Sequence, residues 1–278
     1  MLPIKKVYVD SKYKTEDSVS DSDFKFELGQ SITLPDDTKF FISDCCIPHS
    51  WRTVEYWNNK LYLKIFDDTG INTNYYVITL DEKTYNGTTL ATEIKNKIMT
   101  ATSLSSGVTF TYNVQTNVLS GSINNFTGVF MTDNELQDQS TNFPVVYDVN
   151  NIQSANGIIC NTGKFGVPFT NTQPFETQLQ LQPIRNVYIH SNLGSFSTLG
   201  ARGEQDICKK VPVNNNFSEM IFSDYNAGEA DMLDCSKQTL RQLNFKITNV
   251  DGIVIPVSYT HLRAHETEAD LVCRLLLE

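Results

Sequence analysis

Apolar and polar residues alternate over most of this chain, which is the pattern of half-buried β-strands. The alternation is clearest in KKVYVD (5–10), DFKFEL (23–28) and KLYLKIF (60–66). Further strands are expected at residues 39–47, 75–80, 108–112, 118–123, 126–131, 187–190, 195–199, 207–213, 219–222, 240–248 and 253–255. Turn-forming residues separate these segments, so the fold should be dominated by β-structure.

One segment changes the period from two to about 3.6. Leu90, Ile94 and Ile98 recur at the spacing of one helical face, and Glu93 stands four residues before Lys97, where an ion pair supports a helix. This is the one helix that the pattern predicts clearly. Together with the strands expected on either side of it, it implies a small β-α-β-β unit.

Many short strands, long connections and one helix-bearing unit favour an all-β fold, a single jelly-roll β-sandwich with an inserted small β-α-β-β unit. A chain of 278 residues is also long enough for two small domains. The expected division is 1–80 for the first part of the jelly roll, 81–132 for the insert, 133–174 for irregular surface loops, 175–256 for the second part of the jelly roll, and 257–278 for a separate tail.

Composition narrows the function classes. Hydrophobic residues make up 40% of the chain and charged residues 19%, with a net charge of −10. No cluster of Lys and Arg stands out, so direct sequence-specific binding to nucleic acid is not expected. No apolar run approaches the ~20 residues of a membrane span, and the first residues lack the apolar stretch of a signal peptide. We therefore expect a protein made in soluble form inside a cell.

A thiol or metal site could be built from Asp44, Cys45, Cys46 and His49. Strand alternation, however, sends the two thiols to opposite faces of a sheet, and Pro48 bends the chain before the histidine. The six cysteines include no C-x-x-C pair, so reduced and mostly buried thiols are the expectation.

His190, at the end of an expected strand, is interpreted as a hydrogen-bonded loop histidine that could respond to pH at an interface. The aromatic group Trp51, Tyr56 and Trp57 is interpreted as core or interface packing in preference to ligand stacking. No phosphate-binding, nucleophile-elbow or zinc-protease motif occurs. We therefore expect no enzyme activity and assign no catalytic, cofactor-binding or metal-binding residues.

The tail VSYTHLRAHETEADLVCRLLLE (257–278) differs abruptly from the strand IVI that precedes it. It resembles the translation of a sequencing adapter from a transposase-made library, and Pro256 already takes part in the change. On that interpretation the H-x3-H pair His261 and His265, with Cys273 nearby, is not a native zinc site. Such segments are set aside before fold reasoning.

Several long segments resemble one family. VYVDSKYKTEDSVSDSDFKFEL, LPDDTKFFISDCCIPHSWRTVEYWNNKLYL, YNGTTLATEIKNKI, SNLGSFSTLGARGEQDICKKVPV and LDCSKQTLRQLNFKITNVDGIVIP are similar in order and spacing to the minor capsid (penton) proteins of Polinton/Maverick elements and adintovirus-like viruses. The resemblance covers nearly all of residues 5–255. It implies a single jelly roll that forms homopentamers at capsid vertices beside a separate major capsid protein, and hence a location in the virion.

The same resemblance implies a last strand after the DGIVIP turn, so the native sequence is expected to stop near Ile255 without it. Loops 11–22 and 194–206 are expected to contact other capsomers. A second hypothesis is a host-attachment or glycan-binding module, with the unit 84–131 displayed to a receptor. A third is a carbohydrate-active jelly-roll enzyme, which would require two carboxyl groups ~5–9.5 Å apart in a cleft.

Overall fold

A computed structural model describes residues 5–36, 38–67, 69–70, 72–139, 143, 153–193, 198–200, 202–224, 232–257 and 272–277. The chain divides into two compact units. The jelly-roll unit comprises Met1–Trp51 and Ile184–Glu278, and the insert unit comprises Arg52–Pro183. Neither α1 nor any other helix in the described part of the chain has the length and apolar character of a membrane span.

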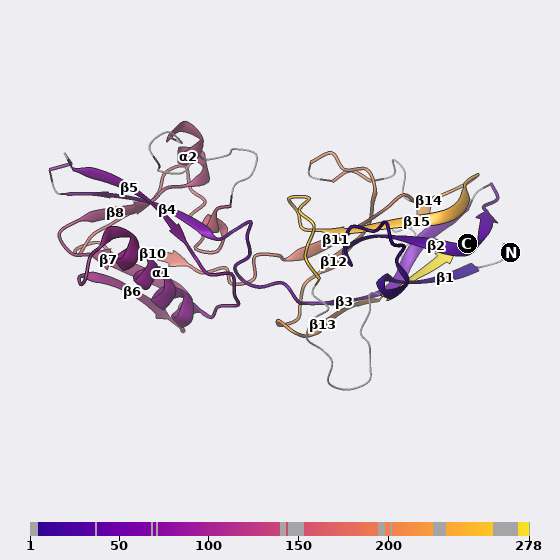
Figure 1. Ribbon diagram of the computed structural model, residues 1–278, viewed down its shortest axis with the longest axis horizontal. Helices are drawn as coiled ribbons and strands as arrows, with labels where there is room; N and C mark the ends of the chain where they lie inside the picture. The colour runs from indigo at the N-terminus through magenta and orange to yellow at the C-terminus, as the bar shows by residue number, and fades with distance from the viewer. Residues whose placement is uncertain are drawn as a thin grey trace. The chain divides into compact units, whose positions relative to one another are not determined.

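The jelly-roll unit consists of two antiparallel sheets (Figure 1). Its elements are β1 (Lys5–Asp10), η1 (Ser11–Tyr13), β2 (Asp23–Thr33), β3 (Lys39–Pro48), β11 (Asn186–Ser191), β12 (Ile207–Pro212), β13 (Met220–Asp224), β14 (Leu233–Asp234), β15 (Thr239–Thr248) and β16 (Val272–Leu277). One sheet has the order β1-β16-β3-β13, with β14 also on β3, and the other has the order β12-β11-β15-β2. Leaving out the short β14, this interleaving of early and late strands is the two-Greek-key order of a jelly roll.

The two sheets bury the alternate residues that the sequence pattern selects. Phe24 and Phe245 stand opposite each other in β2 and β15, and their rings stack with centroids 5.6 Å apart. Val9 and Ile47 supply buried side chains from the other sheet. Each of these side chains is in phase with the alternation of its strand, which explains why the pattern predicted this unit well.

The insert unit enters the jelly roll between β3 and β11. Its elements are β4 (Lys60–Phe66), β5 (Thr73–Thr79), α1 (Gly87–Thr102), β6 (Val108–Asn113), β7 (Val118–Ile123), β8 (Thr127–Phe130), α2 (Asp133–Gln139), η3 (Ala155–Gly157), β9 (Pro168–Phe169) and β10 (Phe175–Gln178). The sheets have the orders β5-β4-β8-β9 and β10-β7-β6. Leu90, Ile94 and Ile98 of α1 are fully buried in one apolar core with residues of both sheets.

The insert unit is wider than the expected 81–132. The hairpin β4–β5 pairs with β8 through residues 63–66, so it belongs to the insert and not to the first part of the jelly roll. On the other side, β10 pairs with β7, which carries the unit on to Pro183. The limits of the insert unit are set by which strands pair with each other, and local periodicity does not reveal this pairing.

The stretch 133–174, expected to be irregular, contains a helix, α2. Thr132 and Glu135 form reciprocal hydrogen bonds at its start, from Thr132 N to Glu135 Oε2 (3.0 Å) and from Glu135 N to Thr132 Oγ1 (3.3 Å). This is a capping box, and the T-x-x-E sequence was available to predict it.

Two expected strands differ in the structure. At 253–255 there is only an isolated bridge between Val254 and Thr248. Of the strand expected at 195–199, residues 195–197 lie outside the described residues, and Thr198 and Leu199 are not in a strand.

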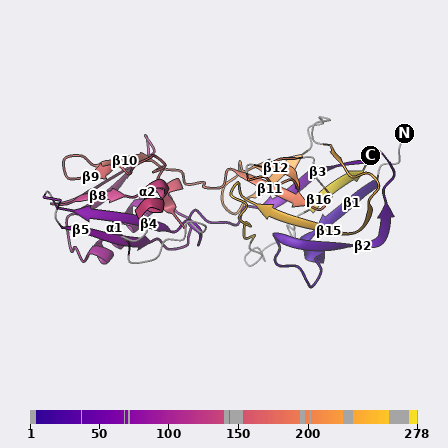
Figure 2. The same ribbon diagram turned by 90° about the horizontal axis from the view of Figure 1, so that it is seen from above.

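The tail supplies a strand of the sheet. β16 lies between β1 and β3 and is antiparallel to both, in the position of the last strand of a jelly roll (Figure 2). The origin of residues 257–278 stays a prediction from sequence.

Candidate functional site

The group Asp44, Cys45, Cys46 and His49 does not form a reactive centre. Cys45 stands in register with Ser223, and its neighbour Cys46 with Phe222, so the two thiols lie on opposite faces as expected. Burial raises the pKa of Cys45 to about 11. Because the thiolate is the nucleophile and the metal ligand, this thiol is inert near neutral pH.

The side chain of His49 contacts residues outside this group. Its Nδ1 lies 2.9 Å from the carbonyl oxygen of Asn215, and its ring packs on Trp51 with centroids 4.3 Å apart. Burial lowers the pKa of the imidazole, so the neutral form is favoured. Among the residues that the structure describes, no group of three His, Cys, Asp or Glu side chains could hold a metal ion.

His190 is the centre of the best-defined polar cluster of the jelly-roll unit. Its Nδ1 lies 2.7 Å from Asp206 Oδ1, and its Nε2 lies 2.9 Å from Thr248 Oγ1. A carboxylate only accepts hydrogen bonds, so Nδ1 donates to Asp206, and in a neutral imidazole Nε2 then accepts from the Thr248 hydroxyl. The order carboxylate, imidazole, hydroxyl is that of a hydrolase triad.

The surroundings of this cluster favour a structural role. Thr248 is only 1% exposed, so its hydroxyl has no access to a substrate carbonyl. His190 lies in β11, Asp206 directly precedes β12 and Thr248 ends β15, and these three strands are neighbours in one sheet. The cluster therefore acts as a cross-strand clamp.

The prediction that His190 is hydrogen-bonded agrees with this geometry, but the prediction that it is a loop residue was wrong, because it lies within β11 and pairs with both neighbouring strands. Its side-chain partners could not be named from the sequence. Asp206 is 16 residues away and Thr248 is 58 residues away. No spacing motif joins them, since only the sheet order brings them together.

The aromatic group near residue 51 is mostly internal. Trp51 and Trp57 are buried, whereas Tyr56 is half exposed. Two of the three rings thus have no free face for stacking on a sugar or base.

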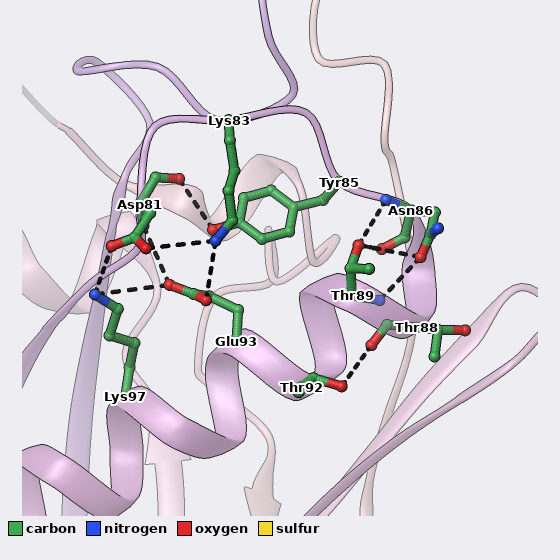
Figure 3. Close-up of polar contacts among 9 residues, drawn as sticks. All are labelled: Asp81, Lys83, Tyr85, Asn86, Thr88, Thr89, Thr92, Glu93 and Lys97. Carbon is green, nitrogen blue, oxygen red and sulfur yellow. Dashed lines mark hydrogen bonds and ion pairs between the residues drawn. The ribbon is translucent and has the colours of Figure 1, made fainter.

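Asp81 and Glu93 are two carboxylates of the insert unit that share the same two lysines (Figure 3). Lys97 Nζ lies 2.6 Å from Asp81 and 3.6 Å from Glu93, which includes the i,i+4 pair expected from sequence, and Lys83 lies 3.4 Å from both. The hydrogen bond from Lys97 lowers the pKa of Asp81. A catalytic acid needs a raised pKa, so Asp81 does not suit that role in glycoside hydrolysis. The network instead links residues 81–83 to Glu93 and Lys97 of α1.

Several apolar side chains of the jelly-roll unit are exposed. Loop 11–22 displays Tyr13 and Val19, which are 68% and 82% exposed. Lys14 pairs with Asp21 at 2.5 Å, and the backbone N–H of Lys25 donates to Ser18 Oγ at 3.0 Å. These contacts tie the loop to itself and to β2 while it presents apolar groups to solvent.

A second group of exposed side chains lies on the outer face of the sheet β1-β16-β3-β13. Tyr8 of β1 is 53% exposed and Phe222 of the edge strand β13 is 65% exposed. Phe222 stands in register with the partly exposed Cys46. Isolated exposed apolar residues are ordinary, but aromatic residues on a sheet face and edge are typical of contact surfaces.

Fold and surface together define a jelly-roll protein with a compact insert between its third and fourth strands, and with exposed apolar side chains on the jelly-roll unit. No protein-family model matches the chain, and no curated protein matches it. Among solved structures it is similar to the selenomethionine-labelled mavirus penton protein, with a TM-score of 0.55 and 12% identity. The match covers 99% of this chain and 98% of that chain, so the two share the whole fold, including the insert.

Proposed function

We propose that this protein is a structural minor capsid protein of the penton type, from a Polinton-like virus, that acts by assembling with itself and with a major capsid protein. The observation that carries the proposal is the full-length fold match to a penton protein, which includes the jelly-roll unit and the insert unit. The buried thiols of Cys45 and Cys235, the buried histidine clamp and the lysine-paired carboxylates are consistent with a role that needs no chemistry.

Loop 11–22 supports the assembly role. An apolar group adds most to an interface when its loop loses little freedom on binding, and the ion pairs and hydrogen bonds of this loop supply that order beforehand. Tyr13 is the type of residue that is enriched among binding hot spots. We assign this loop to contacts with a neighbouring subunit.

The test is the mass of the assembly in solution and its place in the capsid. The full chain is expected to form a species of about five times 31.4 kDa in light scattering. Tyr13→Asp is expected to shift it to monomer, whereas Val114→Asp, at an equally exposed apolar site of the insert unit, should leave it unchanged. Co-expression with the major capsid protein should then place density at the vertices in electron microscopy. A monomer that is absent from vertices would contradict the proposal.

A host-attachment role for the insert unit is the second candidate, and one loop favours it. Residues 163–167 display Phe165, which is 66% exposed. The backbone N–H of Gly166 donates to Glu135 Oε2 at 2.8 Å, and Thr132 Oγ1 donates to the carbonyl of Lys164 at 3.3 Å. An exposed aromatic ring on an anchored loop suits a receptor or glycan.

This second candidate is tested with the full chain on a glycan array and on cells. Binding that Phe165→Ala abolishes, and that Tyr13→Asp leaves intact, is the expected result. Equal binding by both variants, or no binding at all, would reject it.

A further inference from the structure

We infer that the position of β16 is a strand-acceptor slot, which binds a separate extended apolar peptide by backbone pairing with β1 and β3 once the chain's own β16 is displaced. This goes beyond the proposed capsid role and does not depend on it.

The topology creates the slot. β16 is antiparallel to β1 along residues 5–10 and antiparallel to β3 along residues 40–46. β1 and β3 therefore run parallel to each other with one strand between them, a gap of roughly 9–10 Å between strand axes. Among the described residues, β16 is the only strand that pairs with β1.

No rearrangement of the two flanking strands closes this gap cheaply. They could pair with each other only as parallel strands, and only after β1 moved by a whole strand width. That movement would take Val9, which is 1% exposed, out of the core. Without an occupant, each flanking strand presents a row of unpaired N–H and C=O groups, and such rows bind other extended segments.

The register fixes what kind of peptide fits. Position 273 stands opposite Val9 and Cys45, and position 275 stands opposite Ile42, and all three of these side chains are buried. Positions 272 and 274 stand opposite partly or largely exposed residues, among them Cys46 and Tyr8. Positions 276 and 277 stand opposite Phe41 and Phe40, which are also buried. The slot therefore takes an antiparallel strand of about six residues with apolar groups at positions 273 and 275 and at its last two positions, and it tolerates polar groups at 272 and 274.

Backbone pairing is tolerant of sequence, and the present occupant illustrates this tolerance. The segment VCRLLL belongs to the tail whose sequence resembles translated adapter. Nevertheless its backbone pairs with both neighbours along its length. Specificity then comes from the alternation and the direction of the strand, as in other cases of strand addition.

The experiment uses the full chain with Leu275→Pro, because a proline inside a central strand removes a ladder hydrogen bond and displaces the chain's own β16. A fluorescent peptide with the sequence of residues 271–278 is titrated into this variant and into the unmodified chain, whose slot is filled. Binding to the variant alone is expected, with recovered hydrogen-exchange protection in β1 and β3.

Control peptides test the register. A peptide with Asn in place of Cys273 or Leu275 is expected to bind about tenfold more weakly or worse, because a buried amide lacks a partner. Asn in place of Val272 or Arg274 should be tolerated. Equal losses at all four positions, or equal binding to the unmodified chain, would overturn the inference.

A second format covers the case in which the proline variant does not fold. A protease site is placed within residues 258–271 of the otherwise unmodified chain, so that β16 is cut free after folding. The labelled peptide is then expected to replace the cut strand, whereas the uncut chain takes up none. Failure of the label to enter the cut protein would also overturn the inference.

Discussion

The two units of this protein contain similar strands but are assembled from the chain in different ways. The insert unit uses the continuous stretch 52–183, and its core residues come from neighbouring elements such as α1, β6 and β7. The jelly-roll unit joins residues near the two ends of the chain, and Lys5 stands opposite Leu277. Contacts between residues that are close in the sequence form quickly, whereas contacts between distant residues form slowly because the intervening chain must first be closed into a loop. The insert unit should thus fold first and tolerate changes at the ends of the chain.

The largest expected effect separates the units most clearly. Deletion of residues 258–278 removes the strand partner of β1, and we expect the jelly-roll unit to lose most of the ~5–15 kcal/mol that holds a domain folded. The insert unit should keep its protection. Hydrogen-exchange mass spectrometry of β1 and β3 compared with β4 and β8 measures this. Unchanged exchange in β1 would show that it does not need β16.

The reverse experiment destabilises only the insert unit. Phe130 is fully buried, with the rings of Phe169 and Phe175 at centroid distances of 5.3 and 5.4 Å. Phe130→Ala should cost about 3–5 kcal/mol through lost burial and a cavity. Denaturant unfolding followed by exchange in each unit is the measurement, and Phe165→Ala, at an exposed ring, is the control. A loss that is equal in both units would mean that they unfold together.

A smaller effect is expected at the clamp of the jelly-roll unit. His190→Ala leaves the buried hydroxyl of Thr248 without its partner and should cost about 1–3 kcal/mol. Double replacement with Thr248→Val should recover part of that loss, since both polar partners are then gone. The thermal midpoint of the jelly-roll unit reports both values. If the double variant is as unstable as the sum of the single variants, the two side chains are not coupled.

The smallest effect concerns the start of α1. Asn86 Oδ1 accepts from the backbone N–H of Thr89 at 2.9 Å, and Thr89 Oγ1 accepts from the backbone N–H of Asn86 at 3.0 Å (Figure 3). Asn86→Ala should destabilise the insert unit by about 0.5–2 kcal/mol. Thr88→Ala, two residues after the N-cap Asn86, is the matched control. Because alanine has a higher helix propensity than threonine, Thr88→Ala should cause no loss, and an equal loss in both variants would contradict a specific capping role of Asn86.

Sequence reasoning succeeded where one segment contains the whole signal. The bounds of β1, β4 and β7 were predicted to the residue, and the apolar face of α1 was identified correctly. It failed where the structure depends on contacts between segments that are far apart in the sequence. The limits of the insert depend on β4 pairing with β8, and the clamp depends on Asp206 and Thr248 reaching His190. The capping box of α2 was a local signal that was overlooked.

The ladder between β1 and β16 also determines how the jelly-roll unit would respond to force. Lys5 and Leu277 are opposite each other, so the first residue of β1 and the last residue of β16 lie at the same end of this ladder (Figure 1). A pull on the two termini loads its cross-strand hydrogen bonds one after another, as in opening a zipper, because those bonds lie perpendicular to the strands. The jelly-roll unit should therefore begin to unfold at this ladder at low force. The insert unit contains no strand of this ladder and should still be folded after that first step.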